Sequence, residues 1–78
     1  MINLQETLVD IAKAIVDSPE EVKVVETEDD NTITLTLTVA PDDMGMVIGR
    51  HGKIAKAIRT VIKAASANSG KKVNVEIR

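Results

Sequence analysis

Residues 47–59 read VIGRHGKIAKAIR, with two glycines three positions apart inside an otherwise helical pattern. Gly49 and Gly52 bracket the basic pair Arg50 and His51, and glycines at this spacing allow a tight turn. Apolar residues precede the turn, and apolar residues at helical spacing follow it. The pattern predicts a short helix over residues 44–48, a turn, and a helix over roughly residues 53–68 whose inward-facing side chains are Ile54, Ile58, Val61, Ile62 and Ala65.

Strand patterns lie on both sides of these helices. Upstream, residues 32–39 alternate strictly between threonine and an aliphatic residue, which predicts a strand with one buried face and one wet face. A valine-rich strand over residues 22–27 precedes it, and the acidic turn at residues 28–31 joins the two as a hairpin. Downstream, we expect Gly70 to cap the long helix in a left-handed conformation, and residues 72–77 to form a last strand.

The chain begins with a predicted helix. Asn3 is a suitable N-cap, with Glu6 three positions later completing a capping box. One apolar face follows, formed by Leu4, Leu8, Ile11 and Ile15. Val9, Ala12 and Val16 widen this face, and they either enlarge the core contact or form a partner surface. Farther along, Pro41, Asp42 and Asp43 suit the first turn of the short helix.

These elements predict one α+β domain over residues 1–78, in the order α-β-β-α-α-β. A strand that leaves through two helices and returns to the same sheet does so by a right-handed crossover. The last strand is therefore expected parallel to the threonine-rich strand, which lies in the centre of a three-stranded mixed sheet. The helices are expected on one face of the sheet and the threonines on the other.

Composition excludes several classes of function. The 78 residues include no cysteine and one histidine, so disulfides, thiol nucleophiles and multi-histidine metal sites are ruled out. They include no Phe, Trp or Tyr, so base stacking on aromatic rings is disfavoured. Asp29-Asp30 and Asp42-Asp43 are explained by a turn and a helix start, so no catalytic residue, metal or cofactor is expected. No bilayer-spanning run or leader is apparent, which predicts a cytoplasmic protein without a membrane partner or small-molecule substrate.

Charge divides the chain into two halves. Residues 1–43 carry a net charge of −9 and residues 44–78 a net charge of +7, although the whole chain has only −2. Either the two halves neutralise each other within the fold, or the basic half meets an anionic partner. Seven bases lie between the glycine turn and the start of the last predicted strand, namely Arg50, Lys53, Lys56, Arg59, Lys63, Lys71 and Lys72.

The glycine turn has the features of a phosphodiester site. It leads directly into a helix N-terminus, where free amide groups and the helix dipole favour an anion. Arg50 and His51 would project from the tip, with Lys53 and Lys56 on the first helical turn beside them. The spacing that cradles a nucleoside triphosphate is absent, because no Gly-Lys-Ser/Thr run is present.

Residues 47–59 resemble the signature loop of a KH domain, and the predicted element order matches the type II version of that fold. The stretches at residues 17–22, 39–45 and 70–77 are similar to those of small bacterial stand-alone KH-domain RNA-binding proteins, the KhpA-like family. This resemblance covers essentially the whole chain.

The resemblance implies a clamp on about four single-stranded nucleotides of RNA. By position, Gly49 and Gly52 would shape the loop, Arg50 and His51 would contact phosphate, and Lys53, Lys56 and Arg59 would continue the basic surface. The resemblance places Val47, Ile48 and Ile54 either in the floor of the groove or in the core, and we rank the core first. The resemblance further implies an RNA chaperone or post-transcriptional regulator, linked to cell-envelope growth and cell shape, that forms a homodimer or pairs with a larger KH-containing protein.

In the KH fold that the chain resembles, the loop between the first two strands forms part of the other wall of the RNA groove. Here that loop is the acidic turn at residues 28–31, which is expected to repel phosphate and weaken binding. The alternative function is a small dimerising adaptor whose RNA contact is incidental, suggested by the acidic half and the wide apolar face of the first helix.

Overall fold

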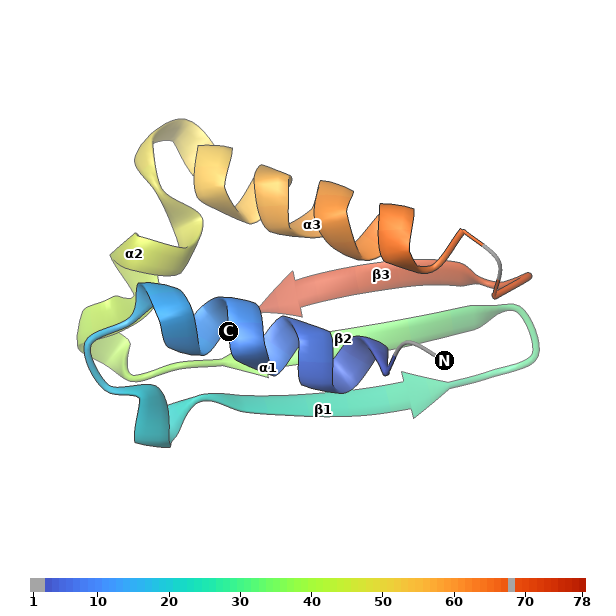
Figure 1. Ribbon diagram of the computed structural model, residues 1–78, viewed down its shortest axis with the longest axis horizontal. Helices are drawn as coiled ribbons and strands as arrows, with labels where there is room; N and C mark the ends of the chain where they lie inside the picture. Colours follow the sequence, from blue (N-terminus) through green and yellow to red (C-terminus); the bar gives the residue numbers. More distant parts are fainter. Residues whose placement is uncertain (1–2, 68) are drawn as a thin grey trace.

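The computed structural model describes residues 3–67 and 69–78 and contains the predicted elements in the predicted order (Figure 1). A single 3₁₀ turn precedes each of the elements β1, α2 and α3. The elements are α1 (Leu4–Ile15), β1 (Lys23–Glu28), β2 (Thr32–Thr38), α2 (Met44–Ile48), α3 (Lys53–Ala65) and β3 (Lys72–Ile77).

The three strands form one mixed sheet in the order β1-β2-β3. β1 pairs antiparallel with β2, placing Val24 opposite Leu37, and β3 pairs parallel with β2, placing Val75 opposite Leu35. The prediction of a central threonine-rich strand with a parallel last strand is confirmed. The connection through α2 and α3 is long enough for the crossover that a parallel pair requires.

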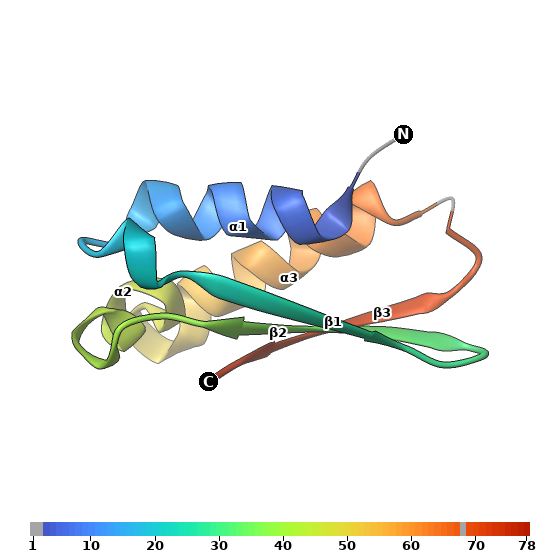
Figure 2. The ribbon, with the colours of Figure 1, turned by 90° about the horizontal axis from the view of Figure 1, so that it is seen from below.

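The helices cover one face of the sheet and leave the other uncovered (Figure 2). On the covered face Leu35 and Leu37 of β2 are fully buried, because alternate residues of a strand point to the same face. The threonines that alternate with the aliphatic residues along β2 lie on the uncovered face. The core against the helices is aliphatic throughout, with Leu8, Ala12, Val47, Ile58 and Ile62 among its most buried members.

The first helix has the expected cap and the expected wide apolar face. The Asn3 side chain accepts a hydrogen bond from the Glu6 amide at 3.1 Å. Of the residues that widen the face, Ala12 and Val16 belong to the core, whereas Val9 is only partly buried. Core contact therefore explains most of the width, and Val9 stays open to solvent on one side.

The long helix differs from the prediction at its end. α3 stops at Ala65, where the Ser66 amide donates to the Ile62 carbonyl at 3.0 Å, and residue 68 lies outside the described residues. Gly70 has a positive φ of 76°, but it lies in the turn before β3 instead of capping the helix. The prediction of a helix-capping Gly70 is therefore wrong, although its left-handed conformation is present.

Two predicted inward positions of α3 are also wrong. Ile54 is 38% exposed and Val61 is 49% exposed, whereas Ala55, Ile58 and Ile62 are buried. Each residue along a helix is rotated by about 100°, so positions next to Ala55 and Ile62 turn away from the sheet. Apolar spacing alone did not separate the buried face from this apolar flank.

Candidate nucleic-acid interface

The glycine turn joins α2 to α3 through an unusual backbone path. Gly49 has φ 73° and ψ 174°, and Gly52 has φ 74° and ψ 15°. Between them, His51 has φ 56° and ψ 26°, so three of the four residues have a positive φ. The Gly49 amide donates to the Gly45 carbonyl at 2.9 Å and the Gly52 amide to the Gly49 carbonyl at 3.2 Å, which closes the turn.

The two glycines are needed for different reasons. A Cβ atom on Gly49 would lie 2.9 Å from the backbone nitrogen of Ile54, closer than real Cβ atoms approach. A Cβ atom on Gly52 would meet nothing within 4 Å, so only its left-handed backbone favours glycine there. Gly49 therefore allows α2 and α3 to approach each other, whereas Gly52 allows the chain to turn.

Arg50 and His51 are both exposed at the tip of the turn. A left-handed conformation costs a residue with a side chain about 1–2 kcal/mol, although histidine occurs there more often than most residues. Strain of this kind is concentrated at functional sites, where the surrounding structure holds it in place. The turn thus presents two cationic or titratable side chains on a backbone that the fold itself constrains.

A row of exposed basic residues continues from the turn along α3. Lys53, Lys56, Arg59 and Lys63 are all exposed, and they recur at helical spacing. The Arg59 Nε atom donates to the Val75 carbonyl at 3.3 Å, so this side chain extends from the helix to β3. The basic row therefore faces the β3 side of the molecule, and Arg59 is held at the edge of the sheet.

The three apolar residues expected as groove floor or core separate into two kinds. Val47 is fully buried in the core, which is the placement that we ranked first for it. Ile48 and Ile54 are each 38% exposed, so placing them in the core first was wrong. Met46 is exposed to the same extent, and the sequence analysis did not single it out. Apolar surface is thus available beside the glycine turn.

The acidic turn does not lie where the sequence analysis expected it. The β1–β2 turn and the α2–α3 turn lie at opposite ends of the molecule (Figures 1 and 2). The Lys71 ammonium group pairs with the Glu28 carboxylate and donates to the Asp29 carbonyl at 3.1 Å. The acidic turn is therefore fastened to the start of β3 and does not form a wall beside the glycine turn.

Asp29 organises the acidic turn through its side chain. Its carboxylate accepts hydrogen bonds from the Asn31 amide at 2.9 Å and the Thr32 amide at 2.7 Å. These hydrogen bonds, with a smaller contribution from the charge of Lys71, lower the pKa of Asp29. The carboxylate thus serves a structural purpose in the hairpin.

The two oppositely charged halves do not neutralise each other within the described part of the chain. Its ion pairs are Lys71 with Glu28 and Arg78 with Glu76, and the first of these alone joins the halves. Among the described residues, the acids of α1 and β1 therefore form no ion pair with the bases of α3.

Asp43 is a structural residue that the sequence analysis missed. It is 2% exposed, and its Oδ2 atom accepts a hydrogen bond from the Ser18 amide at 3.0 Å. The contact joins the α1–β1 connection to the start of α2. Its position four residues before the buried Val47, on the same side of a helix, was a usable signal.

Among residues 3–67 and 69–78, no cluster of three or more His, Asp or Glu residues could hold a metal ion. None of the described helices has the length and apolar character to cross a bilayer.

A three-stranded mixed sheet in the order α-β-β-α-α-β, with a Gly-x-x-Gly turn between two helices, defines a type II KH domain. The fold is shared with the crystal structure of Era from Aquifex aeolicus, at a TM-score of 0.70 and 17% sequence identity. That similarity covers 95% of this chain and 29% of the Era chain.

The KhpA/KhpB KH-domain family matches residues 5–77, and the chain belongs to this family. It is 55% identical to the RNA-binding protein KhpA of Clostridium acetobutylicum over 95% of this chain and 99% of that protein. The protein of the same name from Clostridium perfringens is 58% identical over 86% of this chain and 89% of its own length. The protein of that name from Listeria monocytogenes is 43% identical over 95% of this chain and 97% of its own length. These relatives are named as RNA-binding proteins and not as enzymes.

Proposed function

We propose that this protein binds single-stranded RNA at the turn formed by residues 49–52, holding about four nucleotides. The observation that carries the proposal is the exposed pair Arg50 and His51, on a constrained backbone at the N-terminus of α3. Lys53, Lys56 and Arg59 extend the cationic surface in the direction of β3. A phosphate backbone passing the turn would meet charges at each of these positions.

Ile48 and Ile54 support the same assignment. Both are partly exposed beside the turn, and a nucleobase could cover either side chain without an aromatic ring being present. Contacts of this kind tolerate any base, so we expect little sequence preference.

The cellular role we propose is that of an RNA chaperone or post-transcriptional regulator in the cytoplasm. The names of the relatives, all RNA-binding proteins, support RNA as the partner. The link to cell-envelope growth and cell shape rests on the family resemblance. A small clamp with few contacts suits a protein that binds many RNAs weakly and exchanges them rapidly.

Pairing with a second KH module, in a homodimer or with a larger KH-containing protein, would strengthen this weak clamp. Two linked modules bind one RNA more tightly because the second contact becomes intramolecular. Exposed apolar side chains on α2 and α3 support such pairing, since Met46 is 38% exposed and Val61 is 49% exposed.

Fluorescence anisotropy with a labelled single-stranded RNA tests the site. Arg50→Asp with His51→Asp should abolish binding, while circular dichroism melts stay close to those of the parent, because aspartate tolerates a left-handed backbone. The double variant Lys13→Glu with Lys23→Gln lowers the net charge by the same three units on the other side of the molecule. It should bind RNA as the parent does; unimpaired binding by the loop variant would refute the assignment.

The adaptor hypothesis is the second candidate, and Gly52→Asp separates it from RNA binding. This substitution puts a carboxylate in the turn at a position with open space around it, whereas the same change at Gly49 would disturb Ile54. If RNA binding is the function, Gly52→Asp should lose both RNA crosslinking and cellular activity. If the protein is an adaptor, partner co-purification and activity should survive the loss of RNA.

A further inference from the structure

β1 is an edge strand of the sheet, and among the described residues no strand pairs with its outer side. In an antiparallel pair alternate residues direct their N–H and C=O groups away from the partner strand. The Asp29 amide bonds to the Thr32 carbonyl, so the same alternation directs the backbone groups of Val24, Glu26 and Glu28 outward. All residues of β1 except Val24 are exposed. A further strand could therefore pair along this edge.

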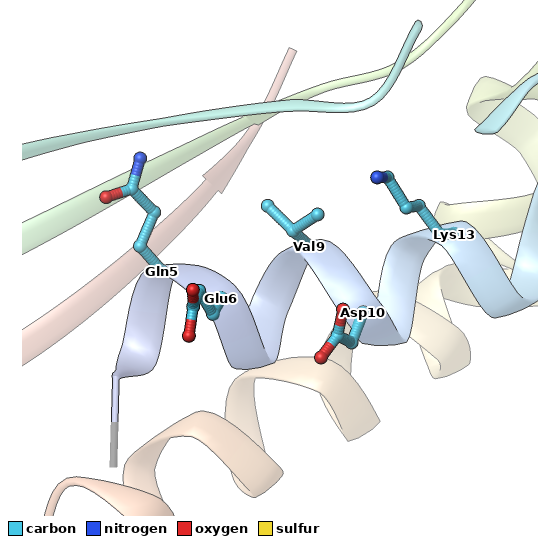
Figure 3. Close-up of a pocket in the computed structure, with 5 residues that line it drawn as sticks. All are labelled: Gln5, Glu6, Val9, Asp10 and Lys13. Carbon is cyan, nitrogen blue, oxygen red and sulfur yellow. The ribbon is translucent and has the colours of Figure 1, made fainter. Parts of the chain in front are cut away.

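One of these outward groups, the Val24 carbonyl, already accepts a hydrogen bond from a side chain. The Gln5 side-chain amide donates to the Val24 carbonyl at 2.7 Å, as the backbone N–H of an added strand would. Gln5 begins a row on α1 with Val9 and Lys13, at successive positions four residues apart, that points toward β1 (Figure 3). The row lines an open groove of about 440 Å³ whose lining residues all lie on α1, and Glu6 and Asp10 project from the side of the helix that faces away from β1.

The charge around this groove selects the kind of partner. Glu6 and Asp10 line the groove on α1, and Glu26 lies on β1 and points to the same side of the sheet as Val24. All three carboxylates therefore belong to the α1–β1 side of the molecule. Among the described residues none of these three carboxylates is in an ion pair. Lys13 is the basic residue of the groove lining and stands at the opposite end of the row from Gln5. The Gln5 end is therefore acidic.

We propose that the β1 edge and this groove bind an extended, lysine- or arginine-rich segment of a partner protein as a fourth strand. Backbone hydrogen bonds to Val24, Glu26 and Glu28 would hold the segment, with one of its N–H groups replacing the Gln5 amide at the Val24 carbonyl. Its basic side chains would meet the acidic side chains of Glu6, Asp10 and Glu26. A second copy pairing through β1 is disfavoured, because Glu26 and Glu28 would face carboxylates of the other copy. The surface lies on the opposite edge of the sheet from β3 and the basic row of α3, so RNA and this segment can bind together.

The probe for this proposal is the synthetic peptide acetyl-(Lys-Val)₃-Lys-amide, added to ¹⁵N-labelled protein. We expect the Val24, Glu26 and Glu28 amides to shift and to exchange with solvent at least about tenfold more slowly, as paired strand amides do. The amides of residues 49–52 should not move. The proposal is overturned if the three β1 amides are not slowed, or if the largest shifts fall on residues 49–59. Protection of the β1 amides that grows with protein concentration, without peptide, would overturn it in favour of a second copy.

Two matched pairs of reagents make the test specific. Glu26→Lys should lower the affinity for the peptide by about three- to tenfold. Glu76→Lys, the same change on β3, should leave that affinity unchanged. Methylating the lysine amides of the peptide and methylating its valine amides block opposite edges of the added strand. One of the two methylated peptides should lose affinity and the other should keep it. Equal affinities of the methylated peptides, or equal weakening by the two variants, would overturn the proposal.

Discussion

Gly49 lies against Ile54 so closely that a Cβ atom on Gly49 would be 2.9 Å from the Ile54 nitrogen. The φ and ψ angles of Gly49 also fall in a region that only glycine occupies readily. We therefore expect Gly49→Ala to lower the free energy of unfolding by about 3 kcal/mol, from strain and overpacking together. Urea denaturation followed by circular dichroism measures this, since the chain has no aromatic fluorophore.

Gly52→Ala is the matched control for that prediction. Gly52 has open space around it and a left-handed backbone, so the substitution should cost about 1 kcal/mol. If the two variants lose the same free energy of unfolding, the close contact between Gly49 and Ile54 does not contribute to the cost of the Gly49 substitution.

His51 pays a conformational cost that glycine would not. We expect His51→Gly to raise the free energy of unfolding by about 0.5–1 kcal/mol, because glycine adopts a positive φ without strain. The same variant should bind RNA more weakly, because a side chain at the tip of the turn is lost. Denaturation and anisotropy on one preparation check both effects; a variant that is stabilised and also binds RNA normally would contradict a phosphate contact at His51.

The buried carboxylate of Asp43 should contribute to stability through Ser18. Asp43→Ala leaves the Ser18 amide without its acceptor, and we expect the free energy of unfolding to fall by about 1–3 kcal/mol. The neighbouring Asp42 is exposed, so Asp42→Ala should change it by about 0.5 kcal/mol or less. Similar effects of the two substitutions, in the same denaturation assay, would argue against a structural role for the buried residue.

The lowered pKa of Asp29 predicts how stability depends on acid. Because the pKa in the folded state lies below the ordinary value of 3.8, the ionised carboxylate stabilises the fold above that value. This stabilisation is lost as the pH falls through the folded-state pKa, so the effect belongs to the range below about pH 4. In thermal melts between pH 5 and 2, the melting temperature should fall less steeply with decreasing pH for Asp29→Asn than for the parent. Asp30→Asn removes the same charge one residue away and should keep the parent slope.

The salt dependence of RNA binding reports the number of phosphate contacts. A clamp on about four nucleotides implies roughly three to five contacts, and each contributes about −0.7 to the slope of log K against log salt. We expect a slope of about −2 to −3.5 for single-stranded RNA, and a slope flatter by about 0.7 for Lys56→Gln. Lys13→Gln, on the acidic side, should leave the slope unchanged. A slope near zero would exclude the basic row as the site.

The strand pairing and the layers could be predicted because the patterns that specify them are local. The threonine alternation of β2 determines which face is buried, and a crossover through two helices leaves only one sensible orientation for β3. The glycine turn was predicted for the same reason, since the two glycines that permit its positive φ angles stand three positions apart in the sequence.

The sequence predicted less well wherever distant elements decide the outcome. Ile54 and Val61 have core-like chemistry, but their burial depends on how α3 is rotated over the sheet, which no spacing along one helix reveals. The placement of the acidic turn depends on Lys71, 43 residues from Glu28. Asp43 has the composition of an ordinary helix start, and only its contact with Ser18, 25 residues away, distinguishes it from Asp42.

The positive φ angles at three of residues 49–52 are maintained only while the surrounding domain is folded. In the unfolded chain Arg50 and His51 would sample many conformations, so RNA bound at the turn as proposed would be a ligand of the native state alone. By thermodynamic linkage, RNA at a hundred times its dissociation constant would then add about 2.7 kcal/mol to the free energy of unfolding. A domain of this size has only a few kcal/mol of its own. The supply of RNA in the cell would thus help to determine the size of the unfolded fraction, which RNA at this concentration would lower about a hundredfold.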